Sequence, residues 1–340
     1  MISSSHSPNL QPLHTFGLPA KANCIETFSD LESLRSHLKN TPSPHLILGD
    51  GSNVAFVGDF PGTVLLNRIK GLHLENTNSG NVKVIAGAGE DWHGLVRWTL
   101  ENGLYGLENL SLIPGRVGAA PIQNIGAYGI EVADLFKGCQ AFDRKTEEVI
   151  FLDHETCNFA YRDSIFKREK DRYVVLEVHL ELSQTFQPNL DYGNLARKAN
   201  ELDGDLDGLG LSQIVSDIRR KKLPHPCDLG NAGSFFKNPI VDLKLKTQLE
   251  ALTPSPPLYE MEDGSFKTSA AWLIDQCGLK GASEGPIAVH EAQPLVLVNH
   301  GGGNGQQLLS LAQRVQKTVR ESFGITLERE VRLIPSSEGS

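Results

Sequence analysis

Cysteine is scarce in this 340-residue chain, and the few cysteines are scattered along it. They are Cys24, Cys139, Cys157, Cys227 and Cys277, with no CxxC pair and no Cys/His spacing typical of metal ligands. An odd and dispersed set of this kind argues against a disulfide framework and against a structural zinc site. We therefore expect no metal centre and, by default, a cytoplasmic protein.

Long apolar runs and an excess of positive charge are also missing. No run approaches the roughly 20 apolar residues that a membrane-spanning helix needs. The start, MISSSHSPNLQPLH, has neither a basic stretch nor an apolar core, so we expect no signal peptide. A net charge of −9 argues against nucleic-acid binding, although a local basic pocket stays open. With 39% hydrophobic and 21% charged residues, the chain should form two or three globular domains.

Two common sequence signatures fail. In the first candidate for GxGxxG, Gly49–Val54, a valine stands in place of the third glycine. In the second, Gly87–Trp92, a tryptophan does. A doubly wound nicotinamide domain is therefore disfavoured. The motif GxSxG is absent as well, which weakens a hydrolase interpretation.

Glycine is concentrated in Asn109–Ile130, NLSLIPGRVGAAPIQNIGAYGI, where Arg116 is the only charge. Prolines interrupt a helix here and glycines weaken a strand. Such a segment lets backbone approach a bound group, so that N–H donors can cradle anionic oxygens. The alternative is a buried, irregular packing segment. A second run of the same character, Leu48–Asn53 (LGDGSN), favours a large cofactor that carries phosphate.

Hydrophobic periodicity predicts an alternation of helices and strands, beginning with a β-α-β arrangement in which the LGDGSN turn follows a strand. The first helix carries a capping-box pattern at Ser29 and Glu32. The predicted helices are Phe28–Asn40, Leu211–Leu223, Ser269–Cys277 and Leu308–Phe323. The predicted strands are His45–Leu48, Thr63–Ile69, Val82–Ala86, Tyr173–Leu182, Pro294–Val298 and Leu327–Ile334.

Four polar features have both a structural and a functional interpretation. Ser183–Asp207 is polar and is predicted to be a mobile loop around Tyr192, at a domain boundary. The basic run Arg219–Lys222 suits either a cationic helix C-terminus or a phosphate pocket. Ser234, in GNAGSFFKNP, is either a turn residue or functional. Glu330, taken by itself, is typical of a carboxylate that lies on a strand and faces solvent.

Five motifs occur in one order: IPGRVGAAPIQNIGAYG, YRDSIFK, GNAGSFFKNP, AAWLIDQCGLKG and LEREVRLI. From His14–Gly17 to Ile334 the chain resembles the UDP-N-acetylenolpyruvoylglucosamine reductase family, in its longer form with a tyrosine loop. The resemblance implies an α+β fold, namely a p-cresol-methylhydroxylase-type FAD-binding fold of two α+β subdomains plus a C-terminal α+β substrate-binding domain. The expected boundaries are 1–72 and 73–207 for the FAD subdomains, 208–325 for the substrate domain, and 326–340 for a strand and tail returning to the active site.

The resemblance also implies a two-step reaction. NADPH delivers hydride to FAD and leaves, and UDP-N-acetylglucosamine enolpyruvate takes its place. Reduced flavin N5 then gives hydride to C3 of the enolpyruvyl group, and a proton reaches C2. The product is UDP-N-acetylmuramate, a peptidoglycan precursor. Because negative charge develops as an enolate-like intermediate, fixed donors or cations must meet it in a water-poor site.

Site residues carry over from matching motif positions. Arg162 and Glu330 should flank the substrate carboxylate, so Glu330 needs protonation or pairing with Arg162. Ser234 matches the general acid, which is credible only toward a strongly basic enolate. The expected FAD contacts are Gly49, Asp50, Gly51, Ser52, Asn53, Ile113, Pro114, Gly115, Gly118, Ala119, Gln123, Asn124, Gly126, Ala127, Tyr128 and Gly129. The expected substrate contacts are Tyr161, Tyr192, Arg219, Lys222, Asn238, Tyr259, Lys267 and Gln293.

Departures from the family pattern are mild. GRVGAAP and LEREV replace the GCVGSSP and LEPEV found in relatives, and Arg329 in place of proline should loosen the turn before Glu330. Two rival interpretations are a sugar or alcohol oxidase of the same FAD fold and a catalytically silent nucleotide-sugar-binding protein. The YRDS, GNAGS and LEREV set argues against the first, and intact Arg162, Ser234 and Glu330 argue against the second. We expect a monomer that binds only small molecules.

Overall fold

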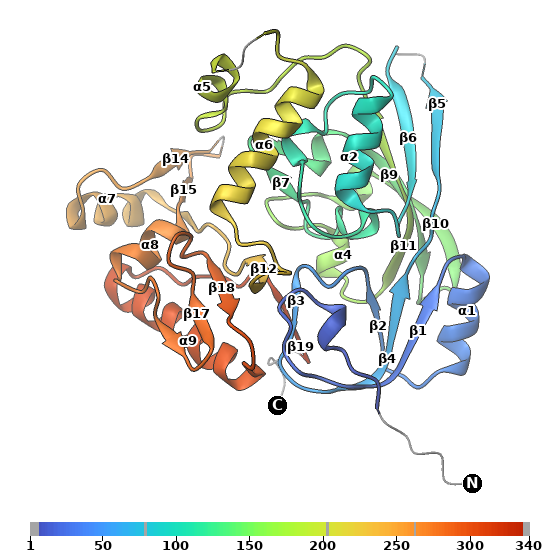
Figure 1. Cartoon of the computed structure of the whole chain (residues 1–340), viewed down its shortest axis with the longest axis horizontal. Helices are drawn as coiled ribbons and strands as arrows, with labels where there is room; N and C mark the ends of the chain where they lie inside the picture. Colours follow the sequence, from blue (N-terminus) through green and yellow to red (C-terminus); the bar gives the residue numbers. More distant parts are fainter. Residues whose placement is uncertain (1–6, 78–79, 202–203, 262, 336–340) are drawn as a thin grey trace. The chain divides into compact units, whose positions relative to one another are not determined.

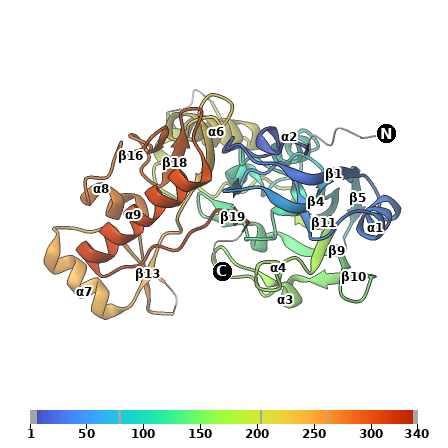
Figure 2. The ribbon, with the colours of Figure 1, turned by 90° about the horizontal axis from the view of Figure 1, so that it is seen from below.

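The computed structural model describes residues 7–77, 80–201, 204–261 and 263–335. The chain divides into two compact units (Figures 1 and 2). Unit 1 comprises Met1–Ala22, Gly51–Phe60 and Lys222–Ser340, and unit 2 comprises Asn23–Asp50 and Pro61–Lys221. Both glycine-rich runs therefore begin in unit 2, and the first run ends in unit 1.

Unit 2 is built on a five-stranded antiparallel sheet in the order β10-β9-β11-β6-β5. Helix α2, Trp92–Glu101, lies along one face of it and buries Trp92, Leu95 and Val96 against the strands (Figure 1). Strand β11 has the predicted bounds, Tyr173–Leu182. The other strands are β5 Leu72–Asn76, β6 Val82–Gly87, β9 Phe136–Asp143 and β10 Glu148–Asp153.

A second sheet in this part of the chain has the order β1-β4-β2, with β2 parallel to β4. Its strands are β1 Ala22–Phe28, β2 His45–Leu48 and β4 Phe60–Asn67, and helix α1, Leu31–Asn40, packs beside it. The predicted capping box was wrong by one residue. The N-cap is Asp30, whose carboxylate accepts from the Ser33 amide at 2.8 Å, because aspartate caps a helix as well as serine does.

Helix α6, Gly208–Lys222, carries the predicted apolar stripe but begins before Leu211. The stripe buries Leu211, Ile214, Val215 and Ile218 against Leu195 of a short helix that sequence reasoning missed, α5 Leu195–Asn200. The polar segment before α6 thus has a packed apolar residue of its own. Short elements complete this unit: η2 Glu108–Leu110, η3 Val117–Ala119, β7 Gly126–Ala127, β8 Ile130–Glu131, η4 Val132–Asp134, α3 His154–Cys157 and α4 Ile165–Arg168.

Unit 1 has a four-stranded antiparallel sheet in the order β12-β18-β17-β16. Helices α8, Ala270–Gln276, and α9, Gly305–Phe323, pack their apolar faces into its core (Figure 2). A three-stranded sheet, β13-β15-β14, lies beside helix α7, Leu243–Leu252. The remaining bounds are η1 Gln11–Leu13, β3 Val54–Phe56, β12 Gly230–Ser234, β13 Ile240–Val241, β14 Leu258–Glu260, β15 Phe266–Thr268, β16 Ser283–Glu284, β17 Ile287–Val289, β18 Val296–Asn299 and β19 Arg332–Ile334.

The C-terminal segment differs from the single strand predicted for Leu327–Ile334. Arg329 forms an isolated bridge with Phe236, and only Arg332–Ile334 is a strand, β19, which runs parallel to β3. The segment therefore changes its pairing partner between these points.

None of the helices in the described ranges is long and apolar enough to span a membrane.

Candidate functional site

The second glycine-rich segment is held by a turn that precedes α2. Asp91 and Arg116 form an antiparallel bridge, the Val117 amide donates to the Glu90 carbonyl at 3.0 Å, and the Gly118 amide donates to the Ala88 carbonyl at 2.9 Å. These bonds replace the regular ladder that the glycines and prolines prevent. The segment is therefore ordered by its neighbours rather than by its own secondary structure.

Two glycines show that close packing within the chain is one reason for this composition. A Cβ atom on Gly118 would lie 2.5 Å from the Cβ of Ala88, and a Cβ on Gly51 would overlap the carbonyl oxygen of Leu13. The packing interpretation therefore holds for these positions. The segment also turns sharply, with φ of 47° at Asn124 and 52° at Tyr128. Left-handed residues next to right-handed ones form concave rows of N–H groups that suit anions.

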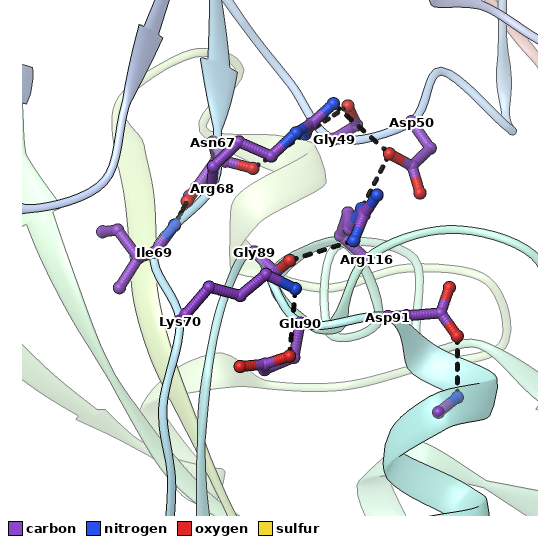
Figure 3. A network of polar contacts seen from close by, with 11 residues as sticks. Gly49, Asp50, Asn67, Arg68, Ile69, Lys70, Gly89, Glu90, Asp91 and Arg116 are labelled. Carbon is purple, nitrogen blue, oxygen red and sulfur yellow. Dashed lines mark hydrogen bonds and ion pairs between the residues drawn. The ribbon is translucent and has the colours of Figure 1, made fainter.

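Charged side chains around the first glycine turn suit the same kind of ligand. Arg68 and Arg116 both approach the Asp50 carboxylate, at 3.4 and 2.7 Å, so that two cations face one anion (Figure 3). The neighbouring Lys70 and Glu90 pair with each other at 3.0 Å. This donor set, together with the turns of the second segment, fits the anionic diphosphate of FAD.

Arg162 lies against the second glycine segment. Its guanidinium donates to the Gly126 carbonyl at 2.7 Å and to the Asn124 carbonyl at 3.2 Å, and it lies 5.2 Å from the centre of the Tyr161 ring. The side chain is only 17% exposed. Since φ is 54° at Arg162, a tight turn aims this side chain.

Arg219 and Tyr192 join the same part of unit 2. Arg219 donates to the Leu112 carbonyl at 3.3 Å. Its pKa is lowered by burial and further by the charge of Arg162, whereas Tyr128 opposes the shift. The ring centres of Tyr128 and Tyr192 lie 5.9 Å apart, edge to face, and Tyr192 remains 55% exposed. Burial raises the pKa of Tyr128, which favours its neutral form.

In unit 1, the chain around Glu330 pairs with the residues that follow Ser234. The Glu330 amide donates to the Phe235 carbonyl at 2.9 Å, and the Lys237 amide donates to the Glu328 carbonyl at 2.9 Å. The Asn53 side chain donates to the Glu330 carbonyl at 3.3 Å. Ser234, Glu330 and Asn53 therefore lie on adjacent backbone segments.

The same ladder bears on Arg329. The Glu328 carbonyl accepts and the Glu330 amide donates in this ladder, so the backbone is hydrogen-bonded on either side of Arg329. The segment is thus paired where a looser turn was expected.

Two predicted substrate residues lie on the small sheet of unit 1, and a third lies just before its strand β13. Tyr259 and Lys267 are direct cross-strand partners, so their side chains share a face. Asn238 lies just before β13 and caps α8 through its side-chain oxygen, which accepts from the Ala270 amide at 3.0 Å. Gln293 lies before β18, and its carbonyl accepts from the amide of Val296, the cross-strand partner of Ser234. Lys222 is exposed at the end of α6.

Sequence reasoning missed Arg68, Glu131 and Asn189 as members of this environment. The Glu131 carboxylate accepts from Asn124 at 2.6 Å and lies 3.9 Å from Arg162. Asn109 donates to the carbonyls of Tyr128 and Asn189, at 2.7 and 3.0 Å, and so ties the tyrosine segment to the glycine segment. No local pattern marks these residues, because each acts through a partner far away in the sequence.

Two family models match the chain. The model described as FAD binding domain covers residues 24–152, and the model described as UDP-N-acetylenolpyruvoylglucosamine reductase, C-terminal domain, covers residues 225–334. The expected p-cresol-methylhydroxylase-type FAD-binding fold with a C-terminal α+β domain is thereby confirmed. The chain carries an FAD-binding domain.

Curated relatives match over nearly full length. The UDP-N-acetylenolpyruvoylglucosamine reductase of Cupriavidus pinatubonensis is 47% identical over 93% of this chain and 95% of its own length. That of Azoarcus sp. is 47% identical over 95% of each. The crystal structure of the reductase from Thermus caldophilus has a TM-score of 0.66 at 24% identity, over 97% of this chain and 98% of that one, and shares the fold. The chain belongs to the UDP-N-acetylenolpyruvoylglucosamine reductase family.

Proposed function

We propose that this protein reduces UDP-N-acetylglucosamine enolpyruvate to UDP-N-acetylmuramate with NADPH, as a cytoplasmic enzyme of peptidoglycan precursor synthesis. The single observation that carries the proposal is the backbone ladder in unit 1 that brings Glu330 beside the chain following Ser234. Nearly full-length relatives with the reductase name support it. We retain 1–72, 73–207, 208–325 and 326–340 as proposed functional divisions.

The proposed flavin site uses both glycine-rich runs. Gly49–Asn53 and Ile113–Gly129 would hold FAD through backbone N–H groups, with the Arg68 and Arg116 cations close to the first run. When bound, FAD supplies the means to take a hydride from NADPH and pass it to the enolpyruvyl group. Within the second run, the carbonyls of Asn124 and Gly126 accept hydrogen bonds from Arg162. The proposed flavin segment and the proposed catalytic arginine are therefore in direct contact.

The proposed role of Arg162 is to stabilise negative charge on the substrate carboxylate. Its guanidinium is sheltered from solvent, so its field is weakly screened. The two carbonyl contacts hold the side chain in place before substrate arrives, and such preorganisation avoids a cost of reorganisation during the reaction. Glu330 would act on the same carboxylate in its protonated form or paired with Arg162.

The proposed role of Ser234 is to donate the proton that reaches C2. Ser234 ends β12, where the ladder shifts register between Asn231 and Ser234. Gly233, with φ of 70°, makes this irregularity possible, and the Asn231 side chain accepts from the Gly233 amide at 3.0 Å. An irregular strand end re-aims a side chain that a regular strand would fix, which is a common device near active sites.

Ping-pong kinetics are the first test of the proposed function. If NADPH and the nucleotide sugar both react at the same flavin atom, they compete for one site, and excess of either inhibits. We expect parallel double-reciprocal lines in initial-rate measurements with both substrates varied. Intersecting lines without substrate inhibition would show separate sites and would contradict the proposal.

The second test concerns Tyr192 and Lys222, proposed to clamp and attract the substrate diphosphate. We expect Tyr192→Phe to weaken nucleotide-sugar binding by roughly 0.5–1.5 kcal/mol, the value of one hydrogen bond. Lys222→Ala should weaken it further and reduce its salt dependence. Isothermal titration at two salt concentrations measures both, with Lys221→Ala as the matched control.

The lid proposed for Tyr192 has a separate readout. The Asn109 contact to the Asn189 carbonyl gives this segment an anchor, and the exposed Tyr192 ring leaves it room to move. We expect the nucleotide sugar to increase hydrogen-exchange protection across Asp191–Leu195. Unchanged hydrogen-exchange protection at saturating nucleotide sugar would contradict the proposal that this segment is a lid.

A further inference from the structure

The side chain of Arg116 contacts two different turns of unit 2 at once. Its Nε atom donates to the Asp50 carboxylate at 2.7 Å, and its Nη1 atom donates to the Gly89 carbonyl at 3.2 Å (Figure 3). Asp50 belongs to the first glycine run, and Arg116 itself belongs to the second. A single guanidinium therefore links both runs to the turn that precedes α2.

The base of this side chain is fixed. The backbone of Arg116 forms the bridge with Asp91, and the next amide, that of Val117, donates to Glu90. Its stem lies on Gly49: a Cβ atom there would be 3.2 Å from the Cγ of Arg116, closer than side chains normally pack. Glycine at this position thus makes room for the arginine stem as well as for a turn.

Arg68 completes the arrangement from the other side. Its Nη1 atom donates to the Gly49 carbonyl at 2.9 Å and to the Asn67 carbonyl at 2.8 Å, while Nη2 lies 3.4 Å from Asp50. The side chains of Asp50, Arg68 and Arg116 are 28%, 29% and 22% exposed. Ion pairs in full solvent contribute little, but this one is sheltered and belongs to a network with backbone acceptors.

We propose that Arg116 is a positioning residue for the flavin. Its ion pair with Asp50 holds the first glycine run against the second, so the backbone that receives FAD is already in place before binding. A preformed site avoids the cost of ordering loops on association, and the gain is seen as affinity. This inference rests on the proposed assignment of both runs to FAD.

The test is a double-mutant cycle on FAD affinity. Arg116→Met removes the guanidinium and keeps much of the stem, and Asp50→Asn removes the charge with little change of shape. We expect each to raise the FAD dissociation constant about ten- to a hundredfold, as loss of a charge-assisted hydrogen bond does. The double variant should lose less affinity than the sum of the two single losses, because both single variants remove the shared Arg116–Asp50 interaction. Arg116→Lys should restore part of the affinity.

The matched control is Arg97→Met, which breaks an exposed ion pair with Glu101 on α2 and should leave FAD affinity unchanged. Melting of each apoprotein is measured beside the titration. Wild-type affinity in both single variants, strictly additive losses, or a lowered melting temperature with wild-type affinity each overturn the inference. If Arg116→Met fails to fold, Asp50→Asn and Arg116→Lys decide by the same criteria. A wild-type protein that bound no FAD would instead refute the flavin assignment itself.

Discussion

Replacing Ser234 by alanine should leave flavin reduction by NADPH intact and slow the reaction with the nucleotide sugar by about 10²–10⁴-fold. General acid catalysis typically contributes a factor of this size, and in the proposed mechanism only the second half-reaction needs the proton. Ser234 is partly buried at the end of β12, and alanine removes only its hydroxyl, so the fold should survive. Stopped-flow measurement of the two half-reactions separates these effects.

The matched control for this variant is Ser283→Ala. Ser283 is an exposed serine at the start of β16, in the same sheet as Ser234. It should change neither half-reaction. Normal turnover of the Ser234→Ala enzyme would contradict the assignment of Ser234 as the acid. So would a reduction by NADPH that slows as much as the reaction with the nucleotide sugar.

Replacing Arg162 by lysine should reduce kcat for the nucleotide sugar by about 10²–10³-fold, the usual loss when one donor to a developing oxyanion is removed. Lysine keeps the charge but lacks the planar fork that reaches both the Asn124 and Gly126 carbonyls. These carbonyls belong to the proposed flavin segment, so FAD content should fall modestly as well. Rates normalised to bound flavin distinguish the two effects.

Arg168→Lys is the control for Arg162→Lys, since it alters an arginine of the same neighbourhood that pairs with Asp163. We expect near-normal rates from it. A normal kcat in Arg162→Lys, per bound flavin, would contradict the proposed electrostatic role and would leave Arg162 as a structural tie for the glycine segment.

Elements with a clear local pattern were predictable from the sequence. Strand β11 is an apolar run interrupted only by Glu177, His179 and Glu181, and α9 carries an unbroken apolar stripe from Leu308 to Phe323, so both were found. The hairpin of β9 and β10 was missed. Gly138 interrupts the β9 pattern because the Phe151 ring of β10 lies where a side chain would be. Glycine is needed at position 138 because of this contact with another strand, and the local sequence of β9 carries no sign of it.

The residues of the candidate site also fall into those that a sequence motif marks and those that only long-range contacts reveal. Ser234, Arg162 and Glu330 stand in motifs that resemble a family, so the motifs by themselves are enough to name these residues. The Arg116 contacts to Asp50 and Gly89, and the Asn109 contacts to Tyr128 and Asn189, join residues far apart in the chain. Composition and spacing carry no signal for such pairs, and only the folded backbone brings them together.

The most direct measurement of the central claim uses the colour of the flavin under anaerobic conditions. The purified protein, saturated with FAD, should be yellow and should be bleached by one equivalent of NADPH. Subsequent UDP-N-acetylglucosamine enolpyruvate should restore the yellow colour and yield stoichiometric UDP-N-acetylmuramate. A flavin that NADPH bleaches but that only dioxygen, and not the nucleotide sugar, re-oxidises would contradict the account.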